Sequence, residues 1–467
     1  MPLSEVQHEN SKIRIDSGFF TKAGLQAEKL VQAMPNERLG TLSATFRKGI
    51  FDIKADSYVE PGNGVPFIRI TDIKTGIIQK EKTAWIDHTA HAIEMKTALK
   101  RGDLVLSKTA YPAAALVNLA DCNVSQDTIA VRLTSEAKKT VRPGYIAAFL
   151  NSSYGLAQMA RRFQGNVQQH LSLEDGKSIR IPLFSILFQN KIQGLVESAD
   201  DQQAAVLQAM QSVEELLLTI LGIADWSPPE PLAYTARAAD VVASKRFDAQ
   251  YFMPAKEQVK QSLAALPGRP LSERVDNVRE QWIPNRVRPD MQVRNYDVTD
   301  ALEPLLDDDK EISCAEEIGS MKKKLQDGDV AVSRLRAYLK EIAVVRTGGH
   351  PPAVGSSEFI VLRPRAERLT PETLMVFLRS LPVQTILKWC QDGSQHPRFS
   401  ENDLLAIPLP EAVLDASAEV TELVQQAFSA KGNARTLLEA AKRAVEIAVE
   451  EDEARALEWL EVAVEEI

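Results

Sequence analysis

The sequence predicts an α+β protein built from two tandem duplicated domains, each followed by a long helix, with the two helices pairing as an antiparallel coiled coil. Three observations lead to this fold class. A segment recurs at a fixed offset, both halves carry strand-forming runs of similar order, and each half ends in a long amphipathic helix pattern. The 467 residues are enough for two or three domains with cores of their own.

The duplication is visible in matched segments. Residues 14–20 (Arg-Ile-Asp-Ser-Gly-Phe-Phe) recur as residues 246–252 (Arg-Phe-Asp-Ala-Gln-Tyr-Phe), and the offset of 232 residues holds through Pro35 and Pro267. Further pairs follow in the same order: residues 101–108 and 327–334, residues 149–152 and 377–380, Gly165 and Gly393, and residues 181–183 and 407–409. Internal repeats of this kind indicate the domain architecture even before individual helices and strands are assigned.

Each repeat begins with a short helix and continues as a strand-rich body. The first short helix is expected over residues 19–34 and its copy over residues 251–266, because each carries an apolar side and stops at a proline. The first body contains apolar, β-branched runs that predict strands at residues 65–70, 104–108, 129–133 and 179–182. One helix is expected over residues 143–163, and its counterpart over residues 371–390.

The long helices follow the bodies. Between residues 186 and 223 apolar side chains recur every seven positions, which is coiled-coil spacing, and a helix of this length is about 55 Å long. The second long helix has a seam of small residues, chiefly alanine, between residues 420 and 444. Small seam residues let two helices approach closely, so this helix is the expected partner of the first. Such pairing would hold the two bodies at opposite ends.

These patterns divide the chain into seven segments. We expect a lead-in and short helix at 1–37, a first body at 38–184, a spacer helix at 185–223, a linker with the repeated short helix at 224–268, a second body at 269–410, a second spacer helix at 411–450, and an acidic tail at 451–467. The linker holds a proline-rich stretch at 226–231, which favours a stiff, exposed connection. The tail is amphipathic; a frayed surface helix is the expected form, with a partner-binding face as the alternative.

The charge is distributed unevenly. The net charge is −9, yet residues 38–182 carry 20 Lys and Arg against 13 Asp and Glu, whereas residues 269–410 carry 20 against 22 and residues 411–467 carry 5 against 14. The basic first body is compatible with a nucleic-acid partner, although a charged block is more commonly a solvated face. No apolar run reaches the length of a membrane span, and a cytoplasmic location with three reduced cysteines is expected.

Several short motifs resemble parts of catalytic or metal sites, but each is incomplete or has a structural explanation. Gly176-Lys177-Ser178 resembles the end of a phosphate-binding loop, but Leu171 occupies the position where that loop needs glycine. His88 and His91 have metal-ligand spacing without further ligands beside them. Asp103 and Asp329 recur, yet a Gly-Asp pair that opens a strand is first a turn signal. We therefore expect a chain with no catalytic or metal site and no cofactor of its own.

The repeats suggest that both bodies contact one long ligand, and duplex DNA is the best candidate. Polar segments follow the matched strand and the matched helix in each body, and they hold the Gln, Asn, Arg and Lys side chains that read bases and bind phosphates. A solvated polar loop is the alternative for any single residue. The candidate DNA-binding residues are Lys54, Arg69, Lys74, Lys108, Tyr111, Arg161, Arg162, Asn166, Gln168, Gln169 and His170 in the first body, and Arg286, Arg334, Arg336, Tyr338, Lys340, Ser394, Gln395, His396 and Arg398 in the second.

At these segments the chain resembles the specificity (S) subunit of type I restriction-modification systems. The resemblance extends over the run at 65–73, the Gly-Asp-Leu-Val-Leu-Ser step, the Phe-Leu-Asn-Ser helix, Ile-Pro-Leu and the spacer helix. It implies two target-recognition domains that each read half of a split DNA target. It also implies helices that dock a DNA adenine methyltransferase, with S-adenosylmethionine bound by that partner, in a complex that a restriction or translocase subunit can join. The second body's lack of net positive charge and the tail beyond residue 450 depart from the family pattern.

Two other classes of function compete with this interpretation. A scaffold that joins proteins without binding DNA would explain the repeats and the helices equally well. A nuclease with dispersed acidic residues would cleave DNA in a metal-dependent way. The interpretation that the sequence favours is a DNA-specificity subunit of a restriction-modification or related phage-defence complex.

Overall fold

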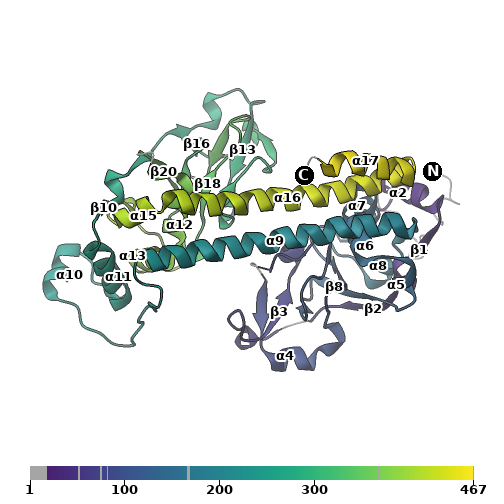
Figure 1. Ribbon diagram of the computed structural model, residues 1–467, viewed down its shortest axis with the longest axis horizontal. Coiled ribbons are helices and arrows are strands. Elements are labelled where there is room, and N and C mark those ends of the chain that lie inside the picture. The colour runs from purple at the N-terminus through teal and green to yellow at the C-terminus, as the bar shows by residue number, and fades with distance from the viewer. Residues whose placement is uncertain are drawn as a thin grey trace. The chain divides into compact units, whose positions relative to one another are not determined.

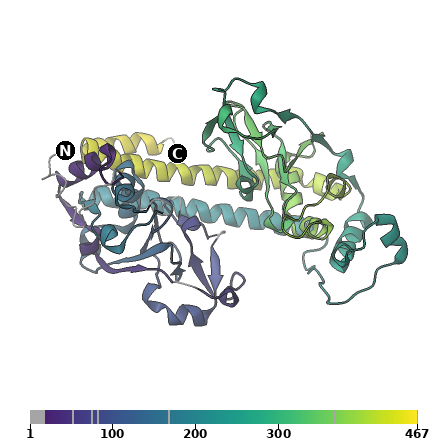
Figure 2. The same ribbon diagram turned by 180° about the vertical axis from the view of Figure 1, so that it is seen from behind.

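The computed structural model describes residues 18–50, 53–73, 76–80, 83–165, 169–365 and 368–465, with the side chains of residues 464 and 465 excepted. The chain forms two compact units (Figures 1 and 2). Unit 1 comprises Met1–Ala205 and Ala430–Ile467, and unit 2 comprises Val206–Ser429. Each unit therefore contains one strand-rich body and one part of each of the two long helices.

The body of unit 1 is formed by three small sheets. A four-stranded antiparallel sheet has the order β2(Ser43–Lys48), β8(Thr128–Leu133), β5(Leu104–Ser107), β6(Ala114–Leu116). A three-stranded sheet has the order β4(Ala84–Ile86), β3(Val65–Ile68), β7(Asn123–Val124), with β7 parallel to β3. The strands β1(Asn36–Arg38) and β9(Arg180–Pro182) pair antiparallel and close the body. The strands predicted from the apolar runs are confirmed.

The body of unit 2 repeats this order of strands. One five-stranded sheet has the order β11(Val275–Val278), β20(Phe359–Pro364), β17(Val330–Ser333), β18(Ile342–Val345), β14(Leu305–Leu306). The other has the order β12(Gln281–Trp282), β16(Lys322–Leu325), β19(Ala353–Gly355), β13(Gln292–Tyr296), β15(Ile312–Cys314), with β19 parallel to β13 as β7 is to β3. The strands β10(Gly268–Pro270) and β21(Pro408–Pro410) close the body.

The Gly-Asp turns are structural in both units. Gly102 and Gly328 have φ angles of 86° and 89°, which glycine adopts without strain. Asp103 is buried and accepts a hydrogen bond from the Arg132 side chain at 2.9 Å, and Asp329 accepts one from the Arg363 side chain at 2.7 Å. The turn interpretation of these aspartates is confirmed, because each carboxylate serves to fix its own turn to the neighbouring strand.

The helices on the bodies differ from the prediction in one respect. The helix expected over 143–163 is two helices, α6(Pro143–Asn151) and α7(Ser153–Arg162), and its counterpart is α12(Pro371–Arg379) and α13(Leu381–Cys390). The break lies at Ser152 and Ser380, whose backbones are extended; the Ser152 hydroxyl caps α7 by accepting from the Gly155 N–H. Serine is more favourable at the cap of a helix than in its interior, because its hydroxyl can bond to backbone groups. The spacing of apolar residues alone does not show such a break.

The two short helices of the repeat follow the predicted positions closely, whereas the smaller helices were not predicted. The two short helices of the repeat are α2(Lys22–Gln32) and α11(Pro254–Ala265). The linker contains α10(Ala238–Ser244), in which no residue is buried. Smaller helices complete the bodies: α3(Leu39–Leu42), α4(His88–Ile93), α5(Ala137–Thr140), α8(Leu173–Lys177), α14(Glu401–Leu405) and α15(Glu411–Asp415).

The two long helices pair with each other within each unit. They are α9(Ile186–Ile220) and α16(Ser417–Glu450), and they run side by side in Figures 1 and 2. In unit 1, Ile192 and Val196 share a core with the region 440–449 of α16, and Ala199 packs with Ala434 and Leu437. Because the partner numbers fall as the α9 numbers rise, the pairing is antiparallel, as predicted. In unit 2, Val213 and Leu217 share a core with Val420 and Val424.

The acidic tail is an ordered part of unit 1, so the expectation of a frayed surface helix was wrong. The tail forms α17(Glu453–Glu465), and Ala456 and Leu460 are buried in the core that includes the long helices. The Glu453 carboxylate accepts a hydrogen bond from the Ser185 N–H at 2.8 Å. Burial of these apolar side chains stabilises the helix. Among the described residues, no helix has the length and hydropathy needed to cross a membrane.

Candidate nucleic-acid interface

Two polar loops that the sequence analysis named as candidate reading surfaces lie side by side in unit 1. One follows β5 (residues 108–113) and the other follows α7 (residues 163–165 and 169–171); together we call them the paired loops of unit 1. The Lys108 carbonyl accepts from the Leu171 N–H at 2.7 Å, and the Gln169 carbonyl accepts from the Ala110 N–H at 3.2 Å. Ala110 has a φ of 62°, which turns the chain sharply and lets the two backbones meet.

Unit 2 contains the same arrangement, formed by residues 334–341 after β17 and residues 391–399 after α13, the paired loops of unit 2. The Arg334 carbonyl accepts from the Phe399 N–H at 3.1 Å, and the Pro397 carbonyl accepts from the Arg336 N–H at 2.9 Å. Arg336 has a φ of 42° and so repeats the turn at Ala110. The backbone hydrogen bonds of one unit thus recur at matching positions in the other.

The second loop of each pair is closed by a small ladder of its own. Gln164 and His170 exchange two backbone hydrogen bonds of 2.9 and 2.8 Å, and Asp392 and Arg398 exchange two of 2.8 Å. Gly165 and Gly393, which open these loops, have φ angles of 112° and 97°. Glycine is required at this point because other residues rarely adopt such φ values. The repeat of Gly165 and Gly393 in the sequence therefore reflects a shared backbone conformation at the start of the two loops.

Several candidate residues are exposed on these loops. Gln169, His170, Tyr338, Ser394, Gln395 and His396 are exposed. Lys108 is partly buried, and burial, together with the nearby charge of Lys48, lowers the pKa of Lys108. Exposed amide, hydroxyl and imidazole groups on a fixed backbone are suited to hydrogen bonding with base edges or phosphates.

The arginines of the paired loops in unit 2 are held by a carboxylate. The Glu358 Oε2 atom accepts from the Arg334 Nε at 2.7 Å, and the Glu358 Oε1 atom accepts from the Arg398 Nη2 at 2.8 Å. These two guanidinium groups lower the pKa of Glu358 to about 2. About two-fifths of each arginine side chain is still exposed, 42% for Arg334 and 41% for Arg398. Both can therefore meet a ligand while Glu358 fixes their orientation.

Other candidates in unit 2 are also placed by local contacts. Arg336 is partly buried, and the Lys340 Nζ lies 3.9 Å from the Glu214 Oε1 on α9. Tyr338 lies between them on a short 3-10 turn and is 58% exposed. Arg286 is exposed on a separate turn, Pro284–Arg286. Arg336, Tyr338 and Lys340 thus come together, whereas Arg286 lies on a different segment.

Two candidates in unit 1 are excluded by burial. Arg161 and Arg162 are each 4% exposed and pair with the buried Glu28 of α2. The Arg162 Nη2 lies 2.5 Å from Glu28 Oε1, and the Arg161 guanidinium also stacks over the Phe19 ring at 4.2 Å. The expectation that these arginines bind DNA was wrong, because they join α7 to α2 in the core. The two arginines lie in a polar segment of the sequence, which gives no indication that they pair with Glu28, more than 130 residues away.

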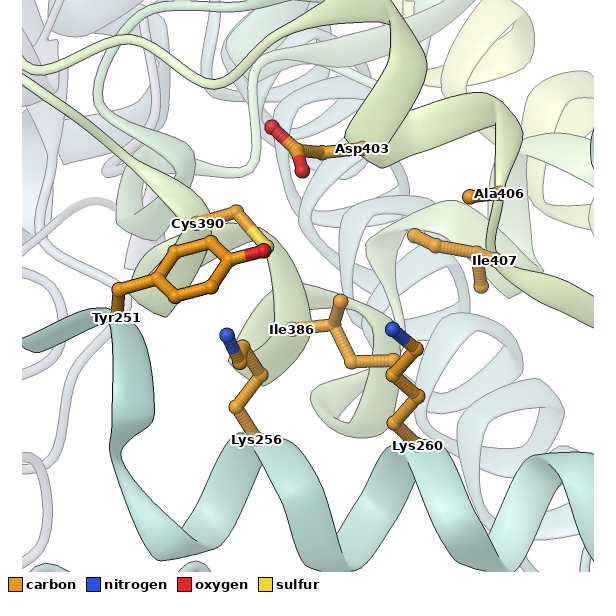
Figure 3. Close-up of a pocket in the computed structure, with 8 residues that line it drawn as sticks. All are labelled: Tyr251, Lys256, Lys260, Ile386, Cys390, Asp403, Ala406 and Ile407. Atoms are coloured by element: carbon orange, nitrogen blue, oxygen red, sulfur yellow. The ribbon is translucent and has the colours of Figure 1, made fainter. Parts of the chain in front are cut away.

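The corresponding contact in unit 2 has different chemistry (Figure 3). There α11 and α13 enclose a cavity of about 40 Å³, which Tyr251, Lys256, Lys260 and Cys390 help to line. The Lys256 Nζ lies 3.3 Å from the centre of the Tyr251 ring, and burial lowers the pKa of Lys256. A cavity of this size holds one or two water molecules, so it is a packing feature.

The remaining candidates of unit 1 fall into three groups. Tyr111 is positioned by its hydroxyl, which donates to the Ile70 carbonyl at 2.8 Å, and burial raises the pKa of Tyr111 to about 12. Lys54 is exposed, and Arg69 is partly exposed and paired with Asp72 at 3.5 Å. Lys74, Asn166 and Gln168 lie outside the described residues.

The sequence did not point to a cleft that opens beside the paired loops of unit 1. It has a volume of about 410 Å³ and is lined by Ile50, Ile53, Tyr58, Phe67, Arg69, Ile70, Thr71, Ser125, Gln126 and Asp127. Four separate segments contribute to it, so no local pattern could have revealed it. Within the described parts of the chain, no group of three or more His, Cys, Asp or Glu side chains is arranged to hold a metal ion.

Comparisons with known proteins found similar solved structures. No family model and no curated protein matches the sequence. The crystal structure of the HsdS subunit from Thermoanaerobacter tengcongensis is 18% identical, with 89% of this chain and 96% of that chain covered and a TM-score of 0.29. A structure that addresses complex assembly and conformational transition of the type I R-M system has the same identity and TM-score, with 89% and 95% covered.

A third solved structure is the S subunit of a type I restriction-modification system from M. genitalium. It is 13% identical, with 87% of this chain and 94% of that chain covered and a TM-score of 0.37. In its sequence motifs the chain resembles the specificity subunit of type I restriction-modification systems.

Proposed function

We propose that the protein is the DNA-specificity subunit of a type I-like restriction-modification or related phage-defence complex. Each unit reads one half of a bipartite DNA target through its paired loops, and the chain docks a DNA adenine methyltransferase that binds S-adenosylmethionine. The chain itself performs no catalysis. The observation that carries the proposal is the recurrence of the paired loops, with matching backbone hydrogen bonds, in both units.

The paired loops have the properties that base reading requires. Their backbones are fixed by hydrogen bonds and sharp turns, so the exposed side chains are held before the ligand arrives. Between the units the backbone is kept while the side chains differ, as at His170 and Arg398 or at Lys108 and Arg334. A conserved frame with variable side chains suits two domains that read two different half-sites.

Phosphate contacts are expected to be stronger in unit 1. Its body carries the excess of Lys and Arg, whereas two arginines of unit 2 share Glu358. Binding through phosphates makes affinity fall steeply with salt, because counterions are released from DNA. The scaffold alternative predicts no such salt dependence, so binding to one duplex at several salt concentrations separates the two functions.

The methyltransferase is expected to bind the long helices. They are the segments that lie outside both bodies, and parts of α9, such as Gln211 and Glu215, remain exposed and polar. Co-expression with a methyltransferase encoded beside this chain, followed by size-exclusion chromatography, tests the docking directly. A methyltransferase that elutes separately at micromolar concentration would contradict this part of the proposal.

Selection from a random duplex library tests the central proposal. The purified chain, alone and with the methyltransferase, is incubated with the library, and the bound fraction is sequenced. We expect enrichment of two short motifs at a fixed separation, because two bodies on one chain read two half-sites. Exchange of residues 38–184 with those of a relative would change one motif and keep the other. A flat library from folded protein would contradict DNA reading and support a scaffold.

A further inference from the structure

The cleft of unit 1 is lined by two kinds of side chains. Its volume of about 410 Å³ lies in the range of small-molecule sites, which is roughly 300–1,000 Å³. We call the apolar and aromatic set the aromatic wall and the polar set the polar wall; the first comprises Ile50, Ile53, Tyr58, Phe67 and Ile70, and the second Arg69, Thr71, Ser125, Gln126 and Asp127. A flat ligand with a hydrogen-bonding edge fits a lining of this composition.

The aromatic wall offers a fixed surface for stacking. Phe67 is 3% exposed and packs edge-to-face against Tyr58, with ring centres 6.1 Å apart and planes at 73°. Tyr58 is 46% exposed, so part of its ring is available to a ligand. The backbone of Tyr58 bridges to Ile86 of β4, which fixes the point from which the side chain extends.

The polar wall offers both acceptors and donors. The Asp127 carbonyl accepts from the Lys108 N–H at 2.8 Å, which joins the cleft directly to the paired loops. The Asp72 carboxylate fixes Arg69 by accepting from its N–H at 2.8 Å. Carboxylate, amide and guanidinium groups together can pair with the edge of any nucleobase, since each base presents donors and acceptors.

Comparison with unit 2 shows a difference in charge at one residue that lines the cleft. Glu358 occupies the position of Asp127, because its carbonyl likewise accepts from the residue that opens the first loop, Arg334, at 3.2 Å. Two arginines bind the Glu358 side chain there. Unit 1 has Lys108 and His170 at the matching positions, and among the described residues no arginine forms an ion pair with Asp127. The Asp127 charge instead acts on Lys108, and Asp127 is one of the residues that line the cleft.

We propose that this cleft binds one unpaired nucleobase of the bound DNA, stacked on Tyr58 and hydrogen-bonded to Asp127 and its polar neighbours. The inference rests on the proposed function, because it places the base next to the paired loops that contact DNA. A base that leaves the duplex stack is commonly held in this way, between aromatic or apolar side chains and groups that read its edge. Stacking on an exposed aromatic ring also tolerates different bases.

The test compares binding of the full chain to two fluorescent DNA hairpins by anisotropy. One hairpin is fully paired and the other is identical except for one unpaired base in the stem. Wild-type protein is expected to bind the second about tenfold tighter, because the cost of unstacking a paired base has been removed. Tyr58→Ala is expected to abolish this preference, and Tyr58→Phe to retain it. Phe247→Ala, which truncates an aromatic side chain 85% exposed in the linker, is the matched control and should retain it.

Each outcome has a distinct meaning. Equal binding of both hairpins would overturn the nucleobase cleft while leaving the proposed function intact, and binding of neither hairpin would overturn the proposed function. A preference that survives in folded Tyr58→Ala protein would place the unpaired base elsewhere and overturn the inference. Competition by micromolar nucleoside monophosphates, with no effect of the unpaired base, would assign the cleft to a free nucleotide and overturn it as well. With 2-aminopurine as the unpaired base, stacking predicts quenching on binding.

Discussion

The same helix–helix contact occurs in both units, with opposite chemistry at its centre. In unit 1, Glu28 of α2 lies between Arg161 and Arg162 of α7. In unit 2, Lys260 stands at the position of Glu28, and the buried cation Lys256 packs against the Tyr251 ring (Figure 3). The repeats have therefore kept the helices and exchanged the charges that join them.

The paired loops differ in the same way. Their backbones are held by matching hydrogen bonds, yet Glu358 fixes two arginines in unit 2, whereas Lys108 and His170 replace those arginines in unit 1. Backbone geometry is thus common to both units, and charge is particular to each. A charged residue at a matched position is consequently a poor guide to function until its partner is known.

The largest expected effect on stability comes from removing the buried Glu28 carboxylate of unit 1. Glu28→Ala leaves two guanidinium groups buried without a counter-charge, and loss of one partner of a buried ion pair costs about 3–5 kcal/mol. Thermal denaturation should show a lower melting temperature, and hydrogen exchange should locate the loss in α2 and α7. Retention of wild-type stability would mean that the arginines reach solvent, and their exclusion from the DNA surface would then be withdrawn.

The next largest effect is expected on DNA sequence recognition, where a variant in each unit should affect a different half-site. Gln169→Ala in unit 1 and Arg336→Ala in unit 2 are each expected to weaken or relax one half-site, because a bidentate base contact contributes roughly 1–3 kcal/mol of discrimination. Library selection with each variant provides the measurement. Each variant serves as the other's control, since the half-site of the unmutated unit should stay unchanged. An equal loss across all sequences would indicate a phosphate contact at the mutated position.

Glu358 forms ion pairs with Arg334 and Arg398, which we call the Glu358 clamp. Loss of this clamp should have a smaller, pH-dependent effect on stability. The folded-state pKa of Glu358 is lowered from 4.5 to about 2, so its contribution to stability is present above pH 4.5 and is lost as the pH falls toward 2. The clamp is partly exposed, and we expect Glu358→Gln to cost about 1–2 kcal/mol at pH 7 after solvent screening. Urea denaturation between pH 7 and pH 4 should show the difference between variant and wild type shrinking below about pH 5. A constant difference would indicate that the ion pairs contribute little.

Sequence reasoning succeeded where a pattern is local or regular. The fixed offset predicted the repeat, the seven-residue spacing predicted α9, and matched glycines located the paired loops. It failed where a residue depends on distant partners. Arg161 is buried against Glu28, which lies 133 positions earlier in the sequence. The helix α17 packs into a core that includes residues of α9 and α16. The cleft combines four separated segments and has no signature in the sequence.

The smallest effect is expected at the contact in unit 2 that matches Glu28. Lys256 is 2% exposed, and the Lys256 Nζ is 3.4 Å from Glu257 Oε1 and rests on the Tyr251 ring. Burial makes its charge costly, so the favourable contacts and the desolvation cost oppose each other. We expect Lys256→Met to change stability at pH 7 by less than about 1 kcal/mol, in contrast to Glu28→Ala, because an apolar side chain of similar length can fill the site.

The pH dependence of this variant tests the reason for the small effect. The pKa of Lys256 is lowered in the folded state, so the unfolded chain binds the proton more strongly, and folding of the wild type becomes more favourable as the pH rises toward the unfolded value of 10.5. Denaturation at pH 7 and pH 9.5 should therefore show wild type gaining stability relative to Lys256→Met. A loss as large as that of Glu28→Ala would mean that the two units depend on buried charge equally, and the contrast between them would not hold.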